Sequence, residues 1–476
     1  MAKEEIVSKK TIGSILKVAA GNLFKLAAGI LVGFLLPKII GVTDYGYYKT
    51  FTLYASYVGL FHFGFADGIY LKYGGKNYDE LDKESFRFYT LFLMGLEFSL
   101  SLVGATIAFL TLSGDLKFIF VCLAVYLLSA NAINYYQIIS QITGRFQELS
   151  RRMAIQSMFT AFSVVVLWLL HRFSDCAISY QIYTVIYVGI FALLAVWYTF
   201  TYRDITFGRR KRGTKEEIFE FVRLGFPLMV ANLCSMLILD LDRQFVRVLF
   251  DTDTYAVYAF AYNMLGMIMT AMTAISTVLY PTLKKTDEET LKNNYGMLTK
   301  AVLILVFACL SVYFPLCQFV RWFLPNYVGS LPIFRIILPG LAASSAVTIV
   351  MHNYYKALGK EMNFFLKSIL ILILSALANY AAYSVFKTTE AISIASVFVL
   401  VVWYLLMESY FIRHDRIKWG KNFLYLLLMG AGFYAITVWD VWWAAMLLYF
   451  ALLIGVTFSF YGKEIGAILR KTFGKR

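Results

Sequence analysis

Long apolar stretches alternate with short basic segments along this chain, and the basic segments fall in every second gap. Hydrophobic residues make up 60% of the 476 positions and charged residues 15%, so a water-soluble fold could not bury this much apolar surface. A spanning helix needs roughly 20 mostly apolar residues, whereas a barrel strand would alternate apolar and polar residues over about ten positions. The pattern therefore predicts an all-α polytopic membrane protein. About fourteen suitable segments occur, at residues 12–36, 47–69, 89–112, 118–139, 153–170, 180–202, 224–249, 255–280, 301–324, 333–355, 364–386, 391–412, 423–438 and 442–461.

The distribution of Lys and Arg predicts the orientation of these segments. Loops rich in positive charge remain in the cytoplasm. Most of the 44 Lys and Arg residues lie in one set of alternate gaps, which includes residues 72–87, 145–152 and 203–215. Both termini are therefore expected in the cytoplasm. The opposite set of gaps holds only Lys38, Lys117, Arg172, Arg321 and Lys387.

The net charge of +15 does not indicate a nucleic-acid partner, because it is spread over the inner loops, where membrane orientation and anionic headgroups account for it. The four histidines and five cysteines are dispersed, so no metal site is expected. No phosphate-binding glycine loop ending in Lys-Ser or Lys-Thr is present in the sequence. The chain is therefore expected not to be an enzyme and to need no cofactor.

Two halves of the chain resemble one another. Segments one to six and seven to twelve predict two six-helix lobes related by an axis along the membrane normal, which can rock around a central cavity. The expected organisation is an N-lobe at 1–202, a basic connector at 203–220, a C-lobe at 221–412, and two further helices with a tail at 413–476. The matches, at similar offsets, are Asn22-Leu23 with Asn232-Leu233, Tyr45 with Tyr255, Tyr48 with Tyr258, and Gly144 with Gly359.

Polar residues in the first two segments mark candidate cavity faces. A cation in the middle of a bilayer costs at least about 2.5 to 3.5 kcal/mol on insertion scales, so it usually faces a wet cavity or a partner. Lys25 is the deepest cation, and an ion pair between the lobes is the alternative to a ligand role. In the first segment Asn22, Lys25, Gly29 and Gly33 share one face, and in the second Lys49, Thr52, Ser56 and Gly59 do so.

The seventh segment carries charges of both signs near its outer end. Asp240, Arg243 and Arg247 are spaced to share one face, and Asp242 lies beside them. These residues can form a self-neutralising ion pair, or they can act as a gate or ligand site. Arg335 is a further cation within a span, and Glu97 is an acid for which the sequence offers no evident partner.

Several motifs resemble those of the polysaccharide transporters of the multidrug/oligosaccharidyl-lipid/polysaccharide exporter superfamily. The resemblance covers the whole chain and favours the Wzx-type O-antigen and capsule flippases. The motifs are Leu-Pro37-Lys-Ile-Ile-Gly41-Val-Thr-Asp-Tyr45-Gly46-Tyr-Tyr48, Gly64-Phe-Ala-Asp-Gly68, Gly225-Phe-Pro227, Leu241-Asp242-Arg243, Tyr255-Ala-Val-Tyr258 and Ala357-Leu-Gly359-Lys360.

This resemblance implies a MATE-like fold and a location in the bacterial plasma membrane. Such flippases move undecaprenyl-diphosphate-linked oligosaccharides from the inner to the outer leaflet by alternating access, for O-antigen, capsule or exopolysaccharide synthesis. The implied partners are this lipid-linked sugar, membrane lipids and glycan polymerase machinery. Lys25, Lys49 and Arg243 are the candidates for neutralising the diphosphate, with Arg335 a weaker one, while Asn22, Thr52 and Ser56 would hydrogen-bond the sugars.

Three alternatives stay open. A multidrug antiporter would share the fold but should hold cationic drugs with buried acids, for which Asp240 and Asp242 are the candidates. A lipid II flippase would differ only in its cargo. An oligosaccharide polymerase would be expected to carry a large outer loop with catalytic residues, and the sequence has none.

Overall fold

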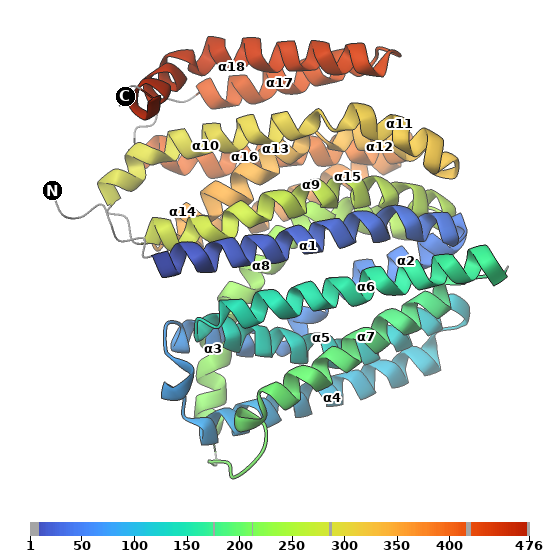
Figure 1. The fold of residues 1–476 in the computed structure, drawn as a ribbon, viewed down its shortest axis with the longest axis vertical. Helices are drawn as coiled ribbons and strands as arrows, with labels where there is room; N and C mark the ends of the chain where they lie inside the picture. The colour runs from blue at the N-terminus through green and yellow to red at the C-terminus, as the bar shows by residue number, and fades with distance from the viewer. Residues whose placement is uncertain (1–8, 175–176, 212, 285–287, 416–419, 474–476) are drawn as a thin grey trace. The chain divides into compact units, whose positions relative to one another are not determined.

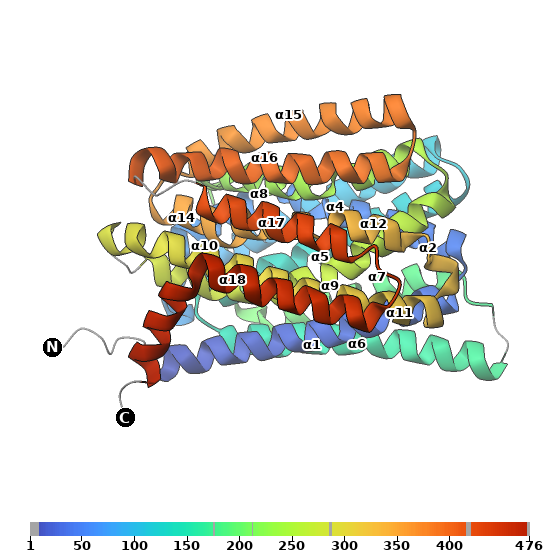
Figure 2. The same cartoon turned by 90° about the horizontal axis from the view of Figure 1, so that it is seen from above.

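The computed structural model describes residues 9–174, 177–211, 213–284, 288–415 and 420–473. Every regular element in these ranges is a helix, as Figures 1 and 2 show. The α-helices are α1 (Lys9–Ile39), α2 (Val42–Ala55), α3 (Phe65–Tyr73), α4 (Lys83–Thr111), α5 (Gly114–Ile142), α6 (Phe146–Ser174), α7 (Tyr180–Thr201), α8 (Lys215–Leu249), α9 (Thr252–Lys284), α10 (Glu288–Leu310), α11 (Tyr313–Phe323), α12 (Ser330–Ile337), α13 (Gly340–Ser345), α14 (His352–Ala357), α15 (Glu361–Phe386), α16 (Thr389–Asp415), α17 (Lys421–Ile436) and α18 (Trp442–Phe473).

The all-α polytopic prediction is confirmed. Within the described residues, nine helices are long and apolar enough to cross a membrane, or ten if the bent pair Ser330–Ile337 and Gly340–Ala357 forms one span. The number of spans counted by helix length and hydropathy is therefore lower than the roughly fourteen that the sequence predicts. Each predicted apolar segment nevertheless lies in a helix or a run of helices, and α17 is apolar but shorter than the spans counted.

Three segments expected as single helices are broken, which corrects the prediction from the sequence. Residues 301–324 are divided between α10 and α11, although these two helices together still count as one span. Between α2 and α3 the chain forms a 3-10 turn at Val58–His62. Phe63 and Gly64 then adopt positive φ angles of 50° and 80°, a region that favours glycine and that stops a right-handed helix. The segment 333–355 is likewise divided among α12, α13, a π-helix at Ala346–Met351 and α14, with a bend of 46° after α12.

The chain divides into two compact units. The first comprises Met1–Leu233 with Phe250–Ala259, and the second comprises Cys234–Leu249 with Phe260–Arg476. In the first unit α1 packs along α6 (Figure 1), and α5 contacts both α4 and α7. In the second unit α15 packs on α16 and α17 on α18 (Figure 2), while α10 and α16 both contact α13.

Three basic segments of the first unit meet at one end of its helices. The guanidinium of Arg87 donates to the carbonyl oxygens of Asp204 and Arg209, each at 2.8 Å. The backbone N–H of Gly75 donates to the Ile142 carbonyl oxygen at 3.1 Å, and Lys83 lies 3.7 Å from the Asp204 carboxylate. These contacts place the loops around 75–87, 142–145 and 203–209 side by side, as expected for loops on one side of a membrane.

Acidic and aromatic groups gather at the other end of this unit. Asp44 accepts from the backbone N–H of Tyr180 at 3.1 Å, and the Tyr180 hydroxyl donates to Asp115 at 2.5 Å. The α2 start and the α4–α5 and α6–α7 connections therefore meet here, with Lys38 and Lys117 nearby in sequence. The alternation of loop charge thus corresponds to two opposite ends of the helices.

Cysteine labelling should report this arrangement in intact cells. In a variant whose natural cysteines are replaced by serine, single cysteines at Ser174, Thr388 and Asp440 should react with an impermeant maleimide. Cysteines at Asn77 and Thr214 should react only after the cells are opened. All of these side chains are exposed, so accessibility within the fold does not limit the reaction. Labelling of a cysteine at Thr214 in intact cells would show that the predicted orientation in the membrane is wrong.

The close approach of α3 and α8 explains the glycines of two sequence motifs. Gly64 and Gly68 begin and line α3, and Gly225 lies in α8. A Cβ atom on Gly225 would overlap the backbone of Gly64 and Gly68, and one on Gly68 would overlap the backbone of Phe221. The two helices therefore approach at their backbones, as small residues permit in membrane proteins. The Phe65 and Phe221 rings pack edge to face beside this contact, with centroids 5.6 Å apart.

Gly225→Ala should lower the amount of folded protein strongly. Overpacking costs about 1–3 kcal/mol, and here the added methyl group meets rigid backbone, so the upper end is expected. Gly29→Ala is the matched control, because a Cβ at Gly29 meets no atom within 4 Å. Fluorescence-detected size-exclusion chromatography of the two variants measures the effect. Equal monodisperse yield of both would show that the close approach is not required.

Candidate functional site

The candidate face of α1 is open around Lys25. The Lys25 side chain is exposed, and the described part of the chain gives it no hydrogen bond or ion pair. Gly29, one turn further along, has no atom within 4 Å of its Cβ position, whereas Gly33 is buried. The side chain of Asn22 lies outside the described residues. A lysine beside an open glycine surface is available to an external anionic group.

The candidate face of α2 holds Lys49, Thr52 and Ser56. The Lys49 ammonium lies 5.2 Å from the Tyr45 ring centroid and 5.9 Å from that of Tyr48, within the range of cation–π attraction. The Thr52 and Ser56 hydroxyls donate to carbonyl oxygens of their own helix, at 3.1 and 2.6 Å. Both hydroxyl oxygens retain acceptor capacity, so they suit sugar hydroxyl donors better than acceptors.

The repeated motifs of the two halves meet at the starts of α2 and α9. Thr43 donates to Asp253 at 2.6 Å, across a separation of 210 residues. The Tyr255 hydroxyl donates to the Lys49 carbonyl oxygen at 3.2 Å. Asp251 accepts from both the backbone and the hydroxyl of Thr254, and these hydrogen bonds hold the pKa of Asp251 below its usual value. The similar sequences therefore also serve as a packing contact that anchors the Lys49 backbone.

In α8 the charged residues divide into two sets of contacts. Arg243 forms an ion pair with Asp240, one turn earlier, and its guanidinium lies 5.0 Å from the Tyr262 ring centroid. Asp242 is 2% exposed and accepts from the Tyr262 hydroxyl and from the Arg243 backbone N–H. Arg247 lies one turn beyond Arg243 and is half-buried. Tyr262 of α9 thus contacts both charges, a role that the sequence analysis missed because the tyrosine lies on another helix.

Arg335 of α12 is half-buried, and within the described chain it makes no ion pair or hydrogen bond. It belongs to the second unit, as do Arg243 and Arg247, whereas Lys25 and Lys49 belong to the first. The candidate cations are therefore divided between the two units, two in the first and three in the second.

The buried acids have partners within the fold. Glu97, which is fully buried, accepts from the Asn131 side-chain amide at 2.8 Å, a partner that the sequence did not reveal. The same amide group also donates to the Val58 carbonyl oxygen at 3.0 Å, beside the break between α2 and α3. Glu408 accepts from Tyr404, one turn away on α16, at 3.0 Å. The Tyr404 and Glu408 spacing could have been recognised in the sequence; the pairing of Glu97 with Asn131 could not.

Solved structures show which fold this arrangement belongs to. The chain is similar to "Lipid II flippase MurJ, inward closed conformation", with a TM-score of 0.72 and 12% identity, over 95% of this chain and 100% of that one. An inward-facing multidrug resistance MATE family transporter of the MOP superfamily gives a TM-score of 0.60 and 15% identity, covering 85% and 99% of the two chains. A MOP superfamily transporter from Pyrococcus furiosus gives 0.56 and 13%, covering 85% and 96%.

The expected MATE-like fold is thereby confirmed. No match is found among curated proteins. The sequence profile of a family described as "Polysaccharide biosynthesis protein" matches residues 13–287, which is more than half of the chain and covers most of α1 and all of α2 to α9. The chain belongs to this polysaccharide biosynthesis protein family.

Proposed function

We propose that this protein is a flippase that moves an undecaprenyl-diphosphate-linked oligosaccharide from the inner to the outer leaflet of the bacterial plasma membrane. Membership of the polysaccharide biosynthesis family is the observation that carries the proposal. The proposed role needs no covalent chemistry and no cofactor. Both termini would lie in the cytoplasm, and a glycan polymerase would use the delivered lipid-linked sugar on the outer side.

The charges of the candidate site support an anionic cargo. Lys25 and Arg335 have no ion-pair partner among the described residues, and Lys49 contacts neutral tyrosine rings. The buried acids Glu97 and Glu408 instead accept hydrogen bonds from neighbouring side chains. A diphosphate bound by lysine or arginine in a low-dielectric cavity forms charge-assisted hydrogen bonds. In the proposal Lys25, Lys49 and Arg243 bind the diphosphate and Arg335 assists.

The remaining candidate residues would contact the sugars and control access. Asn22, Thr52 and Ser56 would hydrogen-bond the oligosaccharide. The Asp240 and Arg243 ion pair, with Asp242 and Arg247 beside it, would act as a gate that breaks as the two lobes rock. The undecaprenyl chain would remain in the lipid, because its transfer through a polar cavity would expose a large apolar surface.

Lipid II is the second candidate cargo. It is favoured by the similarity to the lipid II flippase structure over 95% of this chain. Lipid II presents the same undecaprenyl diphosphate as the proposed cargo, so the cation set suits both, and the sugar portion must discriminate. A multidrug antiporter is the third candidate, because Asp240 and Asp242 could bind a cationic drug. Arg243, however, already forms an ion pair with Asp240.

Reconstituted vesicles can separate these functions. Fluorescent undecaprenyl-diphosphate oligosaccharide and fluorescent lipid II would be incorporated separately, and arrival in the outer leaflet would be measured with an impermeant quencher. A cationic dye would be offered in parallel vesicles. We expect translocation of the oligosaccharide at a higher rate than lipid II and no dye transport. Faster lipid II movement would assign the second candidate, and dye transport alone would contradict the flippase proposal.

A further inference from the structure

An apolar groove runs between α6 and α7 in the first unit. It is a cavity of about 450 Å³ lined by Ile155, Phe159, Ile190, Leu193, Leu194 and Trp197, which is within the range of about 300–1,000 Å³ found for small-ligand sites. Leu194 is buried and forms part of its floor, whereas Phe159 and Leu193 are 51% and 73% exposed at its rim. Both helices are membrane-spanning candidates, so the rim lies at the depth of the lipid acyl chains.

Arg152 lies at one end of this groove. On α6, Arg152, Ile155 and Phe159 share a face at spacings of three and four residues, and on α7 the groove ends at Trp197. The Arg152 guanidinium carbon lies 4.4 Å from the Trp197 ring centroid and 4.3 Å from that of Tyr198. At a rise of about 1.5 Å per residue the groove extends roughly 10 Å from Arg152 along α6 toward the middle of the span.

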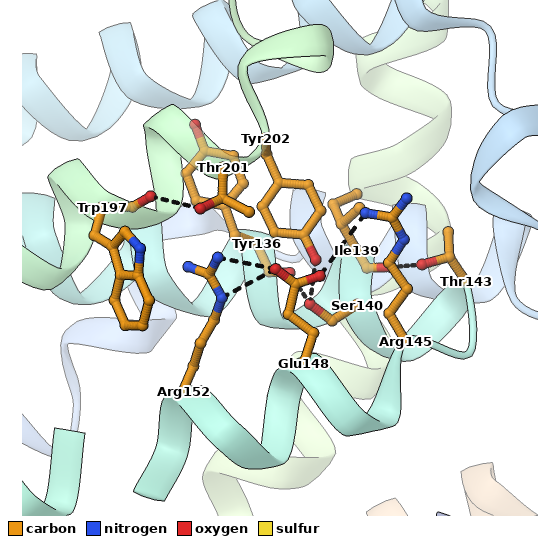
Figure 3. A network of polar contacts seen from close by, with 10 residues as sticks. All are labelled: Tyr136, Ile139, Ser140, Thr143, Arg145, Glu148, Arg152, Trp197, Thr201 and Tyr202. Atoms are coloured by element: carbon orange, nitrogen blue, oxygen red, sulfur yellow. Dashed lines mark hydrogen bonds and ion pairs between the residues drawn. The ribbon is translucent and has the colours of Figure 1, made fainter. Parts of the chain in front are cut away.

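The hydrogen bonds of Arg152 leave one donor group over (Figure 3). Its Nε and Nη2 atoms both donate to Glu148, at 3.2 and 2.9 Å, whereas Nη1 is turned away from Glu148 toward the Trp197 side. The side chain is 1% exposed, and Nη1 has no hydrogen-bond partner. An unpaired guanidinium donor in a buried site costs free energy, which an anionic acceptor entering from the groove would recover.

The charge around Arg152 is positive after Glu148 is counted. Arg145 lies 3.8 Å from the second Glu148 oxygen and stacks over Tyr78 at 3.6 Å. Arg151 is exposed, and no ion pair joins it to the described residues. Arg145 and Arg152 therefore share one carboxylate, and Arg151 adds a further positive charge next to Arg152 in the sequence. Glu148 occupies Nε and Nη2 of Arg152, which form the face of the guanidinium that could bind a diphosphate in bidentate fashion. The remaining Nη1 group, together with Arg151, suits a singly charged phosphodiester.

We propose that this groove binds an anionic phospholipid of the inner leaflet. One acyl chain lies along Ile155, Ile190 and Leu194, and the phosphate accepts from Arg152 Nη1 and from Arg151. Basic pockets between helices at the cytoplasmic side commonly bind such headgroups. The residues that line the groove all belong to α6 and α7, so the site shares no residue with the candidate faces of α1 and α2. The inference does not depend on the nature of the cargo.

Thermal unfolding of the full-length protein in detergent tests this site. Dioleoyl phosphatidylglycerol should raise Tm by several degrees, at a midpoint concentration about tenfold lower than that of dioleoyl phosphatidylcholine, as one charge-assisted hydrogen bond would give. Arg152→Gln should remove the difference between the two lipids. Arg210→Gln removes an exposed arginine elsewhere and should retain it. An equal effect of the two lipids on the wild type would overturn the proposal.

A second variant tests the groove without touching the arginines. Phe159→Ala combined with Leu193→Ala removes the exposed rim and should lower the number of phosphatidylglycerol molecules retained in native mass spectrometry. Phe98→Ala with Leu102→Ala is the matched control on α4, because both side chains are 58% exposed. Unchanged retention of phosphatidylglycerol in the rim variant would contradict lipid binding in the groove. If undecaprenyl diphosphate stabilises the wild type through Arg152 and phosphatidylglycerol does not, the phospholipid assignment is wrong and the groove belongs to the cargo.

Discussion

Replacing Lys25 by alanine is expected to lower translocation of a lipid-linked oligosaccharide by at least about tenfold, the value of one charge-assisted hydrogen bond. Membrane insertion should be retained, because removal of a charge makes a spanning helix easier to insert. Lys25→Arg should keep part of the activity, since it preserves the charge but changes its shape and hydration. Lys25→Glu should be worse than alanine, because it places like charge against the diphosphate.

Vesicles that contain each variant and a fluorescent lipid-linked sugar provide the measurement. Lys38→Ala is the matched control, because Lys38 lies on the same helix beyond the predicted span. Its activity should equal that of the wild type. If the Lys25→Glu variant translocates the lipid-linked sugar as fast as the wild type, Lys25 does not contact the cargo. The proposal of an anionic lipid cargo would then lose its main supporting residue.

Exchanging the charges of Asp240 and Arg243 is expected to restore part of the activity that either alanine variant loses. The two side chains are 14% and 24% exposed, so removal of one leaves a poorly solvated charge, at a cost of about 1–3 kcal/mol. The alanine variants should therefore transport roughly tenfold less or worse. The double exchange retains the pair but alters the contact of Arg243 with Tyr262.

The double-mutant cycle separates a pairing role from a ligand role. Rescue by the exchange would show that Arg243 acts mainly through Asp240. Activity as low as that of the single variants, at equal protein amount in the membrane, would instead indicate that Arg243 itself binds the cargo. Arg321→Ala, on the exposed surface of α11, controls for simple loss of a cation and should be fully active.

The sequence predicted the helical segments because a bilayer imposes length and hydropathy locally. Each predicted apolar segment was found in a helix or a run of helices, and the basic segments near Arg87, Arg145 and Arg203 lie at one end of the first unit. The break at Phe63 and Gly64 was missed, since the residues on either side are as apolar as those of a continuous helix. Hydropathy does not report the backbone φ angles that end a helix.

Contacts between distant residues were decided only by the tertiary structure. Asp240 and Arg243 are three positions apart on one helix, so their pairing follows from helical geometry and could be predicted. Glu97 and Asn131, or Asp242 and Tyr262, meet only because separate helices pack side by side. The same holds for Gly225, whose motif can be recognised in the sequence, while the reason for it, backbone contact with Gly64 and Gly68, depends on how α3 crosses α8. Sequence periodicity assigns a residue to a face of its helix, but packing decides which other helix that face contacts.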